Sequence, residues 1–405
     1  MSALDTHRVW GSCAAVGYLV AAAVVGLGPD RERTRAVAVG AALAGAVVVP
    51  LAYLVVSGHA QSEVEVIERA GRLMVERATP YLDEPRSVVE VTPYLPGMAL
   101  LGMPRALLGA DDPVVRVLGD ARLWCAAVLL GCLWAGRRAF RVASRPAFGG
   151  AVPDVTSPQV ASADAGWVPY RIGLGALVAS PVVALPLAVS GVDLPLAGLL
   201  CLGLVLGARH RPVAAGLVLA AACSLKWTAW PAVPVAVALL AHRDGLRAAV
   251  RCGLVAFAGT ALAVLPGVLL SPRAMAEQVL AFPTGRGEFS TPASSPLPGR
   301  LLAELGPVGW YAAVGMLLAG GLAVAVSLVV RPPRDLLAAA DRLALGLSLA
   351  FLLAPAGRFG YLALPVLLVV WPRLVRAGAR GRPAPQRPDA PSAVPALPVP
   401  AGDVR

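Results

Sequence analysis

The chain has 405 residues, of which 57% are hydrophobic and only 15% are charged, and its mean hydropathy is +0.71. Soluble domains are on average about 45–50% apolar and about 25% charged, so these values exclude an ordinary soluble protein. The net charge of +11 does not indicate a nucleic-acid partner, because the arginines sit in short connectors between apolar runs. We therefore expect an all-α polytopic membrane protein that contacts membrane lipids and no nucleic acid.

Eleven apolar runs are candidates for crossing a hydrocarbon core about 30 Å thick. The pair at 212–225 and 227–241 is short, and the sequence allows either two tilted spans joined at Lys226–Trp227 or one broken helix. In chain order, the predicted spans are 9–28, 36–57, 120–136, 168–188, 191–208, 212–225, 227–241, 245–270, 307–330, 337–354 and 359–375.

The placement of arginine predicts the orientation of these spans. The connectors RERTR, GRRAFR, RHR and RPPR all fall on the cytoplasmic side if the N-terminus lies outside, as the positive-inside rule requires. We expect a multi-pass plasma-membrane protein with its N-terminus outside and its C-terminus in the cytoplasm. The region 58–119 is then extracytoplasmic, and 95–109 must be a re-entrant or interfacial helix that does not cross.

This topology divides the chain into three parts. Residues 1–35 form an extra N-terminal span with its cytoplasmic turn, and residues 36–375 form the membrane core. Within the core, 58–119 and 271–306 are two long extracytoplasmic loops. The connector 142–166 is expected to be mobile, and the Pro/Ala/Arg-rich tail 376–405 is expected to be a disordered cytoplasmic segment.

Residues 57–98, at the start of the first of these loops, hold seven of the chain's 24 acidic residues and two copies of the tetrapeptide TPYL, at 79–82 and 92–95. The pattern predicts an amphipathic helix over 61–77, with Ser62 as N-cap and Glu65 completing a capping box. Glu65 and Glu68 each have an arginine four residues on, at Arg69 and Arg72, so helix-surface ion pairs account for them.

Glu63 has no such partner, because Ile67 is its neighbour four residues on. The helix dipole at the first turn favours its ionised form, which suits a general base that removes a proton from an acceptor hydroxyl. The alternative is that Glu63 only complements the helix dipole.

Cationic residues at membrane depth are the next candidates. Lys226 is the chain's only lysine and lies between apolar runs, where an ammonium could hold the phosphate of a lipid-linked substrate or merely snorkel to the interface. Arg358, in a short outside turn, could share that phosphate or be a plain loop arginine. Asp193 lies at an outside span end, where it could be a helix cap or a polar residue of the site, and we favour the cap.

Tyr81 and Tyr94, one in each TPYL copy, could stack on a sugar or act as interfacial tyrosines. The four histidines are scattered and no metal-ligand spacing is present, so we expect neither a metal site nor a cofactor. No Walker A motif, dinucleotide-binding fingerprint or soluble nucleotide-binding domain is visible, so an enzyme of this kind must take its activated substrate from the membrane.

Several stretches together resemble the GT-C superfamily of integral membrane glycosyltransferases. More narrowly, they resemble the actinobacterial family that includes polyprenyl-phosphate-mannose-dependent α-mannosyltransferases. The resemblance covers roughly 36–375. It rests on the acidic outside loop with its PY element and on TPYLPGMALLGMPRALLG, AGLVLAAACSLKWTAWPAVPVAVALL and FLLAPAGRFGYLALP.

The resemblance implies a role for several matching positions. Glu63 stands where the family carries a catalytic acidic residue that is usually Asp, Pro80–Tyr81 matches the PY element, and Lys226 matches a lysine that ends a span. Tyr94–Leu95–Pro96 corresponds to a Tyr-Pro-Pro-like element that Leu95 interrupts here.

The implied activity is that of an inverting cell-envelope hexosyltransferase. A sugar, expected to be mannose, would move from a polyprenyl-phosphate donor to a lipid or glycan acceptor on the extracytoplasmic side. The alternative from another class is a transporter or flippase of a lipid-linked glycan. It would be expected to show internal repeats and paired ionisable groups at the midplane, and the sequence shows no repeat.

Overall fold

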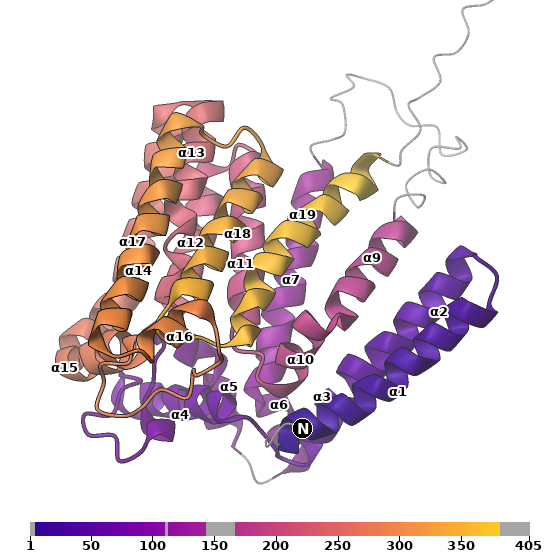
Figure 1. Cartoon of the computed structure of the whole chain (residues 1–405), viewed down its shortest axis with the longest axis horizontal. Coiled ribbons are helices and arrows are strands. Elements are labelled where there is room, and N and C mark those ends of the chain that lie inside the picture. The colour runs from indigo at the N-terminus through magenta and orange to yellow at the C-terminus, as the bar shows by residue number, and fades with distance from the viewer. Residues whose placement is uncertain (1–4, 110–111, 143–166, 381–405) are drawn as a thin grey trace, which may run out of the picture.

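A computed structural model describes residues 5–109, 112–142 and 167–380. Apart from a single parallel bridge between Ser294 and Gly357, these residues form helices and loops. Upright helices form a bundle, with the short helices α4, α5 and α6 gathered at one of its ends (Figure 1). The predicted all-α membrane fold is therefore confirmed. The predicted mobile connector, from residue 143, and the tail beyond residue 380 lie outside the described residues.

Seven helical segments are long and apolar enough to cross a membrane, and an eighth arises if the pair α9 (Trp167–Ala179) and α10 (Pro181–Val189), bent by 64°, counts as one span. All eleven predicted spans fall on helices. Fewer than eleven of these helical segments are long enough to cross a membrane, however, because three of them form short helices. The seven are Asp5–Leu27, Glu32–Val56, Ala121–Arg141, Leu246–Leu270, Pro307–Val330, Leu336–Leu353 and Phe359–Gly378.

The short apolar helices are α11 (Leu194–Ala208), α12 (Pro212–Leu225) and α13 (Ala232–Asp244). The chain between the last two breaks completely: Lys226 is extended, and one 3-10 turn, η4 (Trp227–Ala229), follows it. The segment 212–241 is therefore two helices joined at Lys226, which is the first of the two arrangements that the sequence allowed.

The N-terminal helices pack as a tight hairpin. The first, α1 (Asp5–Leu27), lies against a second, continuous helical segment made of α2 (Glu32–Leu43), η1 (Ala44–Val48) and α3 (Val49–Val56). A Cβ atom on Gly17 would lie 2.7 Å from the Cα of Gly45, so only glycine permits this approach. The Trp10 indole donates to the Ala46 carbonyl at 2.8 Å, and this bond fixes the rotation of α1.

The predicted amphipathic helix is α4 (Ser62–Arg77), and its buried face includes Val64, Ile67 and Gly71. It ends because Ala78 adopts the left-handed conformation, with its N–H donating to the Met74 carbonyl. The predicted boundaries are therefore correct to one residue, and a mixed apolar and acidic face is what a helix at the edge of the bundle requires.

Two expected stabilising contacts of α4 are wrong, the capping box and the Glu68–Arg72 ion pair. Gln61 is the N-cap and makes no side-chain cap bond, so Ser62 and Glu65 form no capping box. Glu68 pairs with Arg105 at 3.0 Å and accepts the Ala121 N–H at 3.1 Å, and it makes no ion pair with Arg72. Tertiary partners replace the helix-surface pairs, because α4 packs against other elements at its polar positions.

The region 95–109 forms two short helices, η3 (Pro96–Leu101) and α5 (Met103–Leu108), which are far too short to cross the membrane. They lie directly against α4: a Cβ atom on Gly102 would be 2.0 Å from the Ile67 carbonyl oxygen. The neighbouring η2 (Val88–Glu90) and α6 (Pro113–Gly119) complete this end of the bundle.

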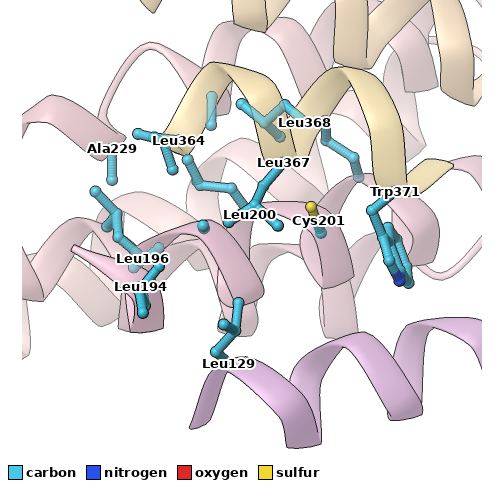
Figure 2. Packing of buried hydrophobic residues seen from close by; sticks show 14 of the residues in the cluster. Leu129, Leu194, Leu196, Leu200, Cys201, Ala229, Leu364, Leu367, Leu368 and Trp371 are labelled. Carbon is cyan, nitrogen blue, oxygen red and sulfur yellow. The ribbon is translucent and has the colours of Figure 1, made fainter. Parts of the chain in front are cut away.

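The core lies between α7 (Ala121–Val142), α11 and α19 (Ala363–Arg380), as the buried leucines of Figure 2 show. Leu129, Leu200 and Leu367 are each fully buried there. Trp371 is also fully buried, and its indole N–H donates to the Tyr170 hydroxyl at 3.1 Å. Because α19 continues to Arg380, residues 376–380 of the predicted tail are helical.

The last part of the chain adds the second loop and three long helices. The loop carries short helical turns before α17 (Pro307–Val330), and η7 (Phe359–Leu362) joins α18 (Leu336–Leu353) to α19. The loop is tied to the α18–η7 turn, because Ser295 N donates to Gly357 O and Gly357 N donates to Ala293 O, both at 3.0 Å. The remaining elements are α14 (Leu246–Leu270), α15 (Pro272–Met275), η5 (Ala276–Ala281), η6 (Phe282–Thr284) and α16 (Pro298–Ala303).

Candidate functional site

Glu63 lies in the first turn of α4 and forms an ion pair with Arg358, whose Nη1 donates to its Oε1 at 2.5 Å. Burial raises the pKa of the Glu63 carboxyl above its ordinary value, although the Arg358 and Lys226 charges and a hydrogen bond from Ser190 oppose the rise. The helix dipole was expected to hold this carboxylate ionised. Desolvation is the larger effect, which brings the group closer to the pKa of an effective general base.

The elements around α4 fix the position of this carboxylate. The fully buried Arg122 of α7 pairs with Asp120 and also donates to the carbonyl of His59, just before α4, and to that of Leu54 in α3. The turn from α3 into α4 is therefore anchored on a guanidinium with satisfied partners, so Glu63 is presented from a constrained backbone.

Lys226 lies at the break between α12 and η4, with its side chain only 13% exposed. Its ammonium pairs with Asp193 at 2.7 Å and lies 4.5 Å from the ring centroid of Tyr361 and 5.7 Å from that of Tyr94. Leu95 N donates to the Leu225 carbonyl, which closes the end of α12 just before the lysine. The lysine is therefore enclosed by protein and does not snorkel to an interface.

Asp193 was interpreted as a helix cap, and this is wrong. It precedes α11, but its side chain accepts no hydrogen bond from the first turn of that helix. The turn before it contains Gly191 in a left-handed conformation, with φ +70°, and Pro195 opens α11. This backbone leaves the carboxylate free to accept from Lys226, and it adds a second carboxylate to the site.

Arg358 comes from the short turn after α18, and its side chain is 20% exposed. The loop 271–306 holds this turn through the Ser294–Gly357 bridge, and the Phe359 N–H donates to the Ser295 hydroxyl at 3.3 Å. The structure thus brings Glu63, Asp193, Lys226 and Arg358 together from four distant parts of the chain.

Two cavities meet at Glu63 and Arg358, which line both of them. The first has a volume of about 290 Å³, and Lys226 is its only other charged residue among those described. Its remaining walls are mostly apolar and aromatic, and they include Leu317 of α17 and Leu347 of α18. It therefore combines two cations and one carboxylate with an apolar wall formed by membrane-spanning helices.

The second cavity, of about 830 Å³, is lined by more polar side chains. Its charged walls are three carboxylates, Asp5, Glu63 and Asp193, and a single arginine, Arg358. The two cavities therefore differ in the sign of their charge as well as in their polarity.

The two TPYL copies pack against each other. The Tyr81 hydroxyl donates to the Tyr94 carbonyl at 2.9 Å, and Thr92 donates to the Pro80 carbonyl at 3.3 Å. Gln278 of η5 joins both copies, since it accepts from Thr92 N and donates to Leu82 O. Tyr94 lines the smaller cavity, whereas Tyr81 lines neither cavity and supports Tyr94 from behind.

Sequence reasoning missed the contributions of Ser190 and the first turn of α1 to this site, and for Asp193 it preferred the helix cap over the alternative of a polar-site residue. Asp193 carries one signal that the sequence shows, a carboxylate that follows Gly191 and precedes Pro195 at the end of a predicted span. Nothing in the local sequence of α1 points to the site, because that helix meets it only through the tertiary packing of the bundle.

Comparison with curated proteins and with solved structures gives no match. The family model described as glycosyltransferase family 87 matches residues 92–355. The match includes Tyr94, Asp193 and Lys226, whereas Arg358 lies three residues beyond its end and Glu63 lies 29 residues before its start. Because it covers more than half of the chain, the protein belongs to glycosyltransferase family 87 and is a membrane glycosyltransferase.

Proposed function

We propose that the protein transfers a sugar, expected to be mannose, from a polyprenyl-phosphate donor to a hydroxyl group of a lipid or glycan acceptor on the extracytoplasmic side, with a GT-C-like mechanism. The observation that carries this proposal is the position of Glu63, which lines both a small cationic apolar cavity and a larger polar one. A base that faces two compartments can take a proton from a substrate in one while the sugar enters from the other.

The smaller cavity suits the donor. Lys226 and Arg358 supply two cations for a phosphate, and Leu317 and Leu347 of the spanning helices supply an apolar wall for the first prenyl units. Tyr94 and Tyr361 line the same cavity, where aromatic faces can pack on a sugar ring. The lipid-linked donor would thus reach the site from the bilayer.

The larger cavity suits the acceptor, because it offers hydroxyl and imidazole groups beside its apolar walls. In the proposed reaction, the Glu63 carboxylate accepts the proton of an acceptor hydroxyl, and that oxygen forms a bond to the anomeric carbon. The bond from this carbon to the phosphate oxygen breaks, and polyprenyl phosphate leaves with the electron pair. Attack on the face opposite the leaving group inverts the configuration of the sugar.

Lys226 and Arg358 neutralise the charge that develops on the departing phosphate. The ion pair between Arg358 and Glu63 must be loosened when the donor binds, because the phosphate competes for the same guanidinium. Once that happens, the carboxylate is free to accept a proton. This sequence favours transfer over a flippase without chemistry, in which a base between the two cavities would have no task.

The orientation follows from the same arrangement. The α1–α2 turn and the arginine-containing connectors lie at the end of the bundle opposite α4, α5 and α6 (Figure 1). We propose that the arginine-rich end is cytoplasmic, with the N-terminus outside and the C-terminus inside. A membrane-impermeant maleimide added to intact cells should then label Ser290→Cys and should not label Arg247→Cys. The reverse pattern would overturn this orientation.

The proposed activity is tested with the purified protein in lipid nanodiscs, radiolabelled polyprenyl-phosphate mannose and a lipid extract as acceptor. Glu63→Gln should lower transfer by about 10²–10⁴-fold, the usual contribution of a general base. Lys226→Gln should raise KM for the donor. Glu65→Gln, at an exposed position in the same helical turn, is the matched control and should retain transfer. Full transfer by Glu63→Gln would contradict the proposal.

A further inference from the structure

The first turn of α1 forms part of the wall of the larger cavity. Asp5, Thr6 and His7 line it together with residues of the site. This helix lies outside both the family match and the resemblance seen in the sequence. The polar side chains that α1 adds to this wall therefore lie outside the part of the chain that the family model matches.

Several independent contacts hold α1 in this place. The Tyr18 hydroxyl donates to the Ala179 carbonyl at 2.6 Å, which joins α1 to α9, and the Trp10 indole joins it to η1. The Gly17–Gly45 approach seats it against the following helix. Because these contacts fix both the depth and the rotation of α1, its first turn is a defined wall of the cavity.

The charge of the cavity restricts its ligand. Its three carboxylates face one arginine, and that arginine is already paired with Glu63. The three carboxylates have cationic partners, Asp5 in Arg8, Asp193 in Lys226 and Glu63 in Arg358. An anionic group placed there would compete with these carboxylates for cations that they already hold, whereas hydroxyl groups would find donors and acceptors. The uncharged polar groups on its walls include Thr6, His7, Gln61, Ser62, Ser190 and Ser295.

The size of the cavity points the same way. At about 830 Å³ it is nearly three times as large as the donor cavity, and it lies within the range of pockets that enclose a complete small-molecule ligand, about 300–1,000 Å³. A compartment of this volume with uncharged hydrogen-bonding groups on several walls suits sugar rings with free hydroxyl groups.

We propose that the first turn of α1 belongs to the acceptor site, and that Thr6 and His7 hydrogen-bond an uncharged polyhydroxyl head group of the acceptor and thereby set acceptor choice. This inference rests on the proposed function, since it assigns the larger cavity to the acceptor. Thr6 and His7 are specificity residues here, separate from the transfer chemistry at Glu63.

The first test compares two acceptors that differ in one group, n-octyl β-D-glucoside and n-octyl β-D-glucuronide, in the nanodisc assay with polyprenyl-phosphate mannose. The glucoside should be used with a kcat/KM about tenfold higher or more, because the glucuronide carboxylate meets like charges. Asp5→Asn removes one of the three carboxylates and should narrow this ratio. Equal use of the two acceptors, or preference for the glucuronide, would overturn the inference.

The second test uses Thr6→Val and His7→Phe, which keep similar shapes and remove hydrogen-bonding groups. Each should raise KM for n-octyl β-D-glucoside by about two- to tenfold, the usual range for one hydrogen bond, and leave KM for the donor unchanged. Leu19→Ala, at an exposed apolar position of the same helix, is the control and should leave both values unchanged.

The outcomes separate the two proposals. Transfer by the wild-type chain with unchanged acceptor KM in both α1 variants would overturn the role of α1 and leave the proposed function standing. A parallel rise of acceptor and donor KM would indicate general distortion of the site and would also overturn it. Absence of both transfer and donor cleavage in the wild-type chain would contradict the proposed function, and the inference with it.

Discussion

Arg358 and Glu63 lie 295 positions apart in the chain and form an ion pair at the point where two cavities meet. Each side chain is held by a different structure, Glu63 by the packing of α4 and Arg358 by the bridge to the second loop. The pair therefore links the proposed base to the proposed phosphate-binding cation. Donor binding at Arg358 would change the environment of Glu63 directly.

The pH dependence of transfer tests this link. Burial raises the pKa of Glu63 and the Arg358 charge lowers it, so the base form is lost as the pH falls through a value above that of an exposed glutamate. Arg358→Gln removes the opposing charge and should move the acid limb of the kcat/KM profile to higher pH. It should also raise KM for the donor, which is measured in the same series.

Arg300→Gln is the control for this series, because Arg300 forms an ion pair with Glu304 on α16 and lines neither cavity. Its profile should overlay that of the unsubstituted chain. An unchanged acid limb in Arg358→Gln would show that Glu63 does not govern the profile.

Substitution of Asp193 should shift the acid limb of the same kcat/KM profile in the opposite direction. Its negative charge raises the pKa of Glu63, so Asp193→Asn should move the acid limb to lower pH. The amide oxygen of Asn can still accept from Lys226, whose charge is then uncompensated, and inhibition by the product polyprenyl phosphate should become stronger. Asp193→Ala removes the hydrogen bond as well and should raise KM for the donor. A shift of both variants in the same direction as Arg358→Gln would contradict this account.

The elements whose signals are local could be predicted from the sequence. The apolar runs located all the helices that carry the predicted spans, and the pattern of α4 placed its ends within one residue. The exact number of spans could not be predicted, because α11, α12 and α13 are too short to pass as full spans. Composition does not measure how deeply a short buried helix sits in the membrane.

Contacts between distant segments could not be predicted. Glu68 has an arginine four residues on, which gave it a local partner, yet Arg105 and the Ala121 N–H take its carboxylate. Asp193 has the position of a helix cap, yet its side chain turns to Lys226. The local interaction is worth a few tenths of a kcal/mol for the ion pair and about 1 kcal/mol for the cap. In both cases it yields to a partly buried tertiary pair. Glu63 was singled out because it had no local partner, and its true partner is 295 positions away.

The contact between α4 and η3 predicts a sharp dependence on glycine. A Cβ atom on Gly102 would lie 2.0 Å from the Ile67 carbonyl oxygen, and one on Gly71 would lie 2.3 Å from the Gly102 carbonyl carbon. Gly102→Ala and Gly71→Ala should therefore displace α4, destabilise the protein by about 1–3 kcal/mol and lower transfer through Glu63. Thermal unfolding in nanodiscs and the transfer assay measure the two effects.

Gly131 offers the matched control, since it lies inside α7 and a Cβ atom there would meet nothing within 4 Å. Gly131→Ala should leave transfer unchanged and should, if anything, stabilise the helix. If Gly102→Ala and Gly71→Ala unfold at the same temperature as the unsubstituted chain, α4 is not held by this close approach.

Leu95 interrupts a Tyr-Pro-Pro-like element, and the structure gives this departure a physical consequence. The Leu95 N–H donates to the Leu225 carbonyl at 3.0 Å, directly before Lys226, and proline has no N–H to donate. Leu95→Pro should therefore cost about 1–3 kcal/mol in the free energy of unfolding, the penalty of an unsatisfied buried carbonyl, and raise KM for the donor by loosening the lysine. Leu95→Met keeps both the N–H and the bulk of this buried side chain, and should behave like the unsubstituted chain. If Leu95→Pro has the same free energy of unfolding and the same donor KM as the unsubstituted chain, the end of α12 does not depend on this bond.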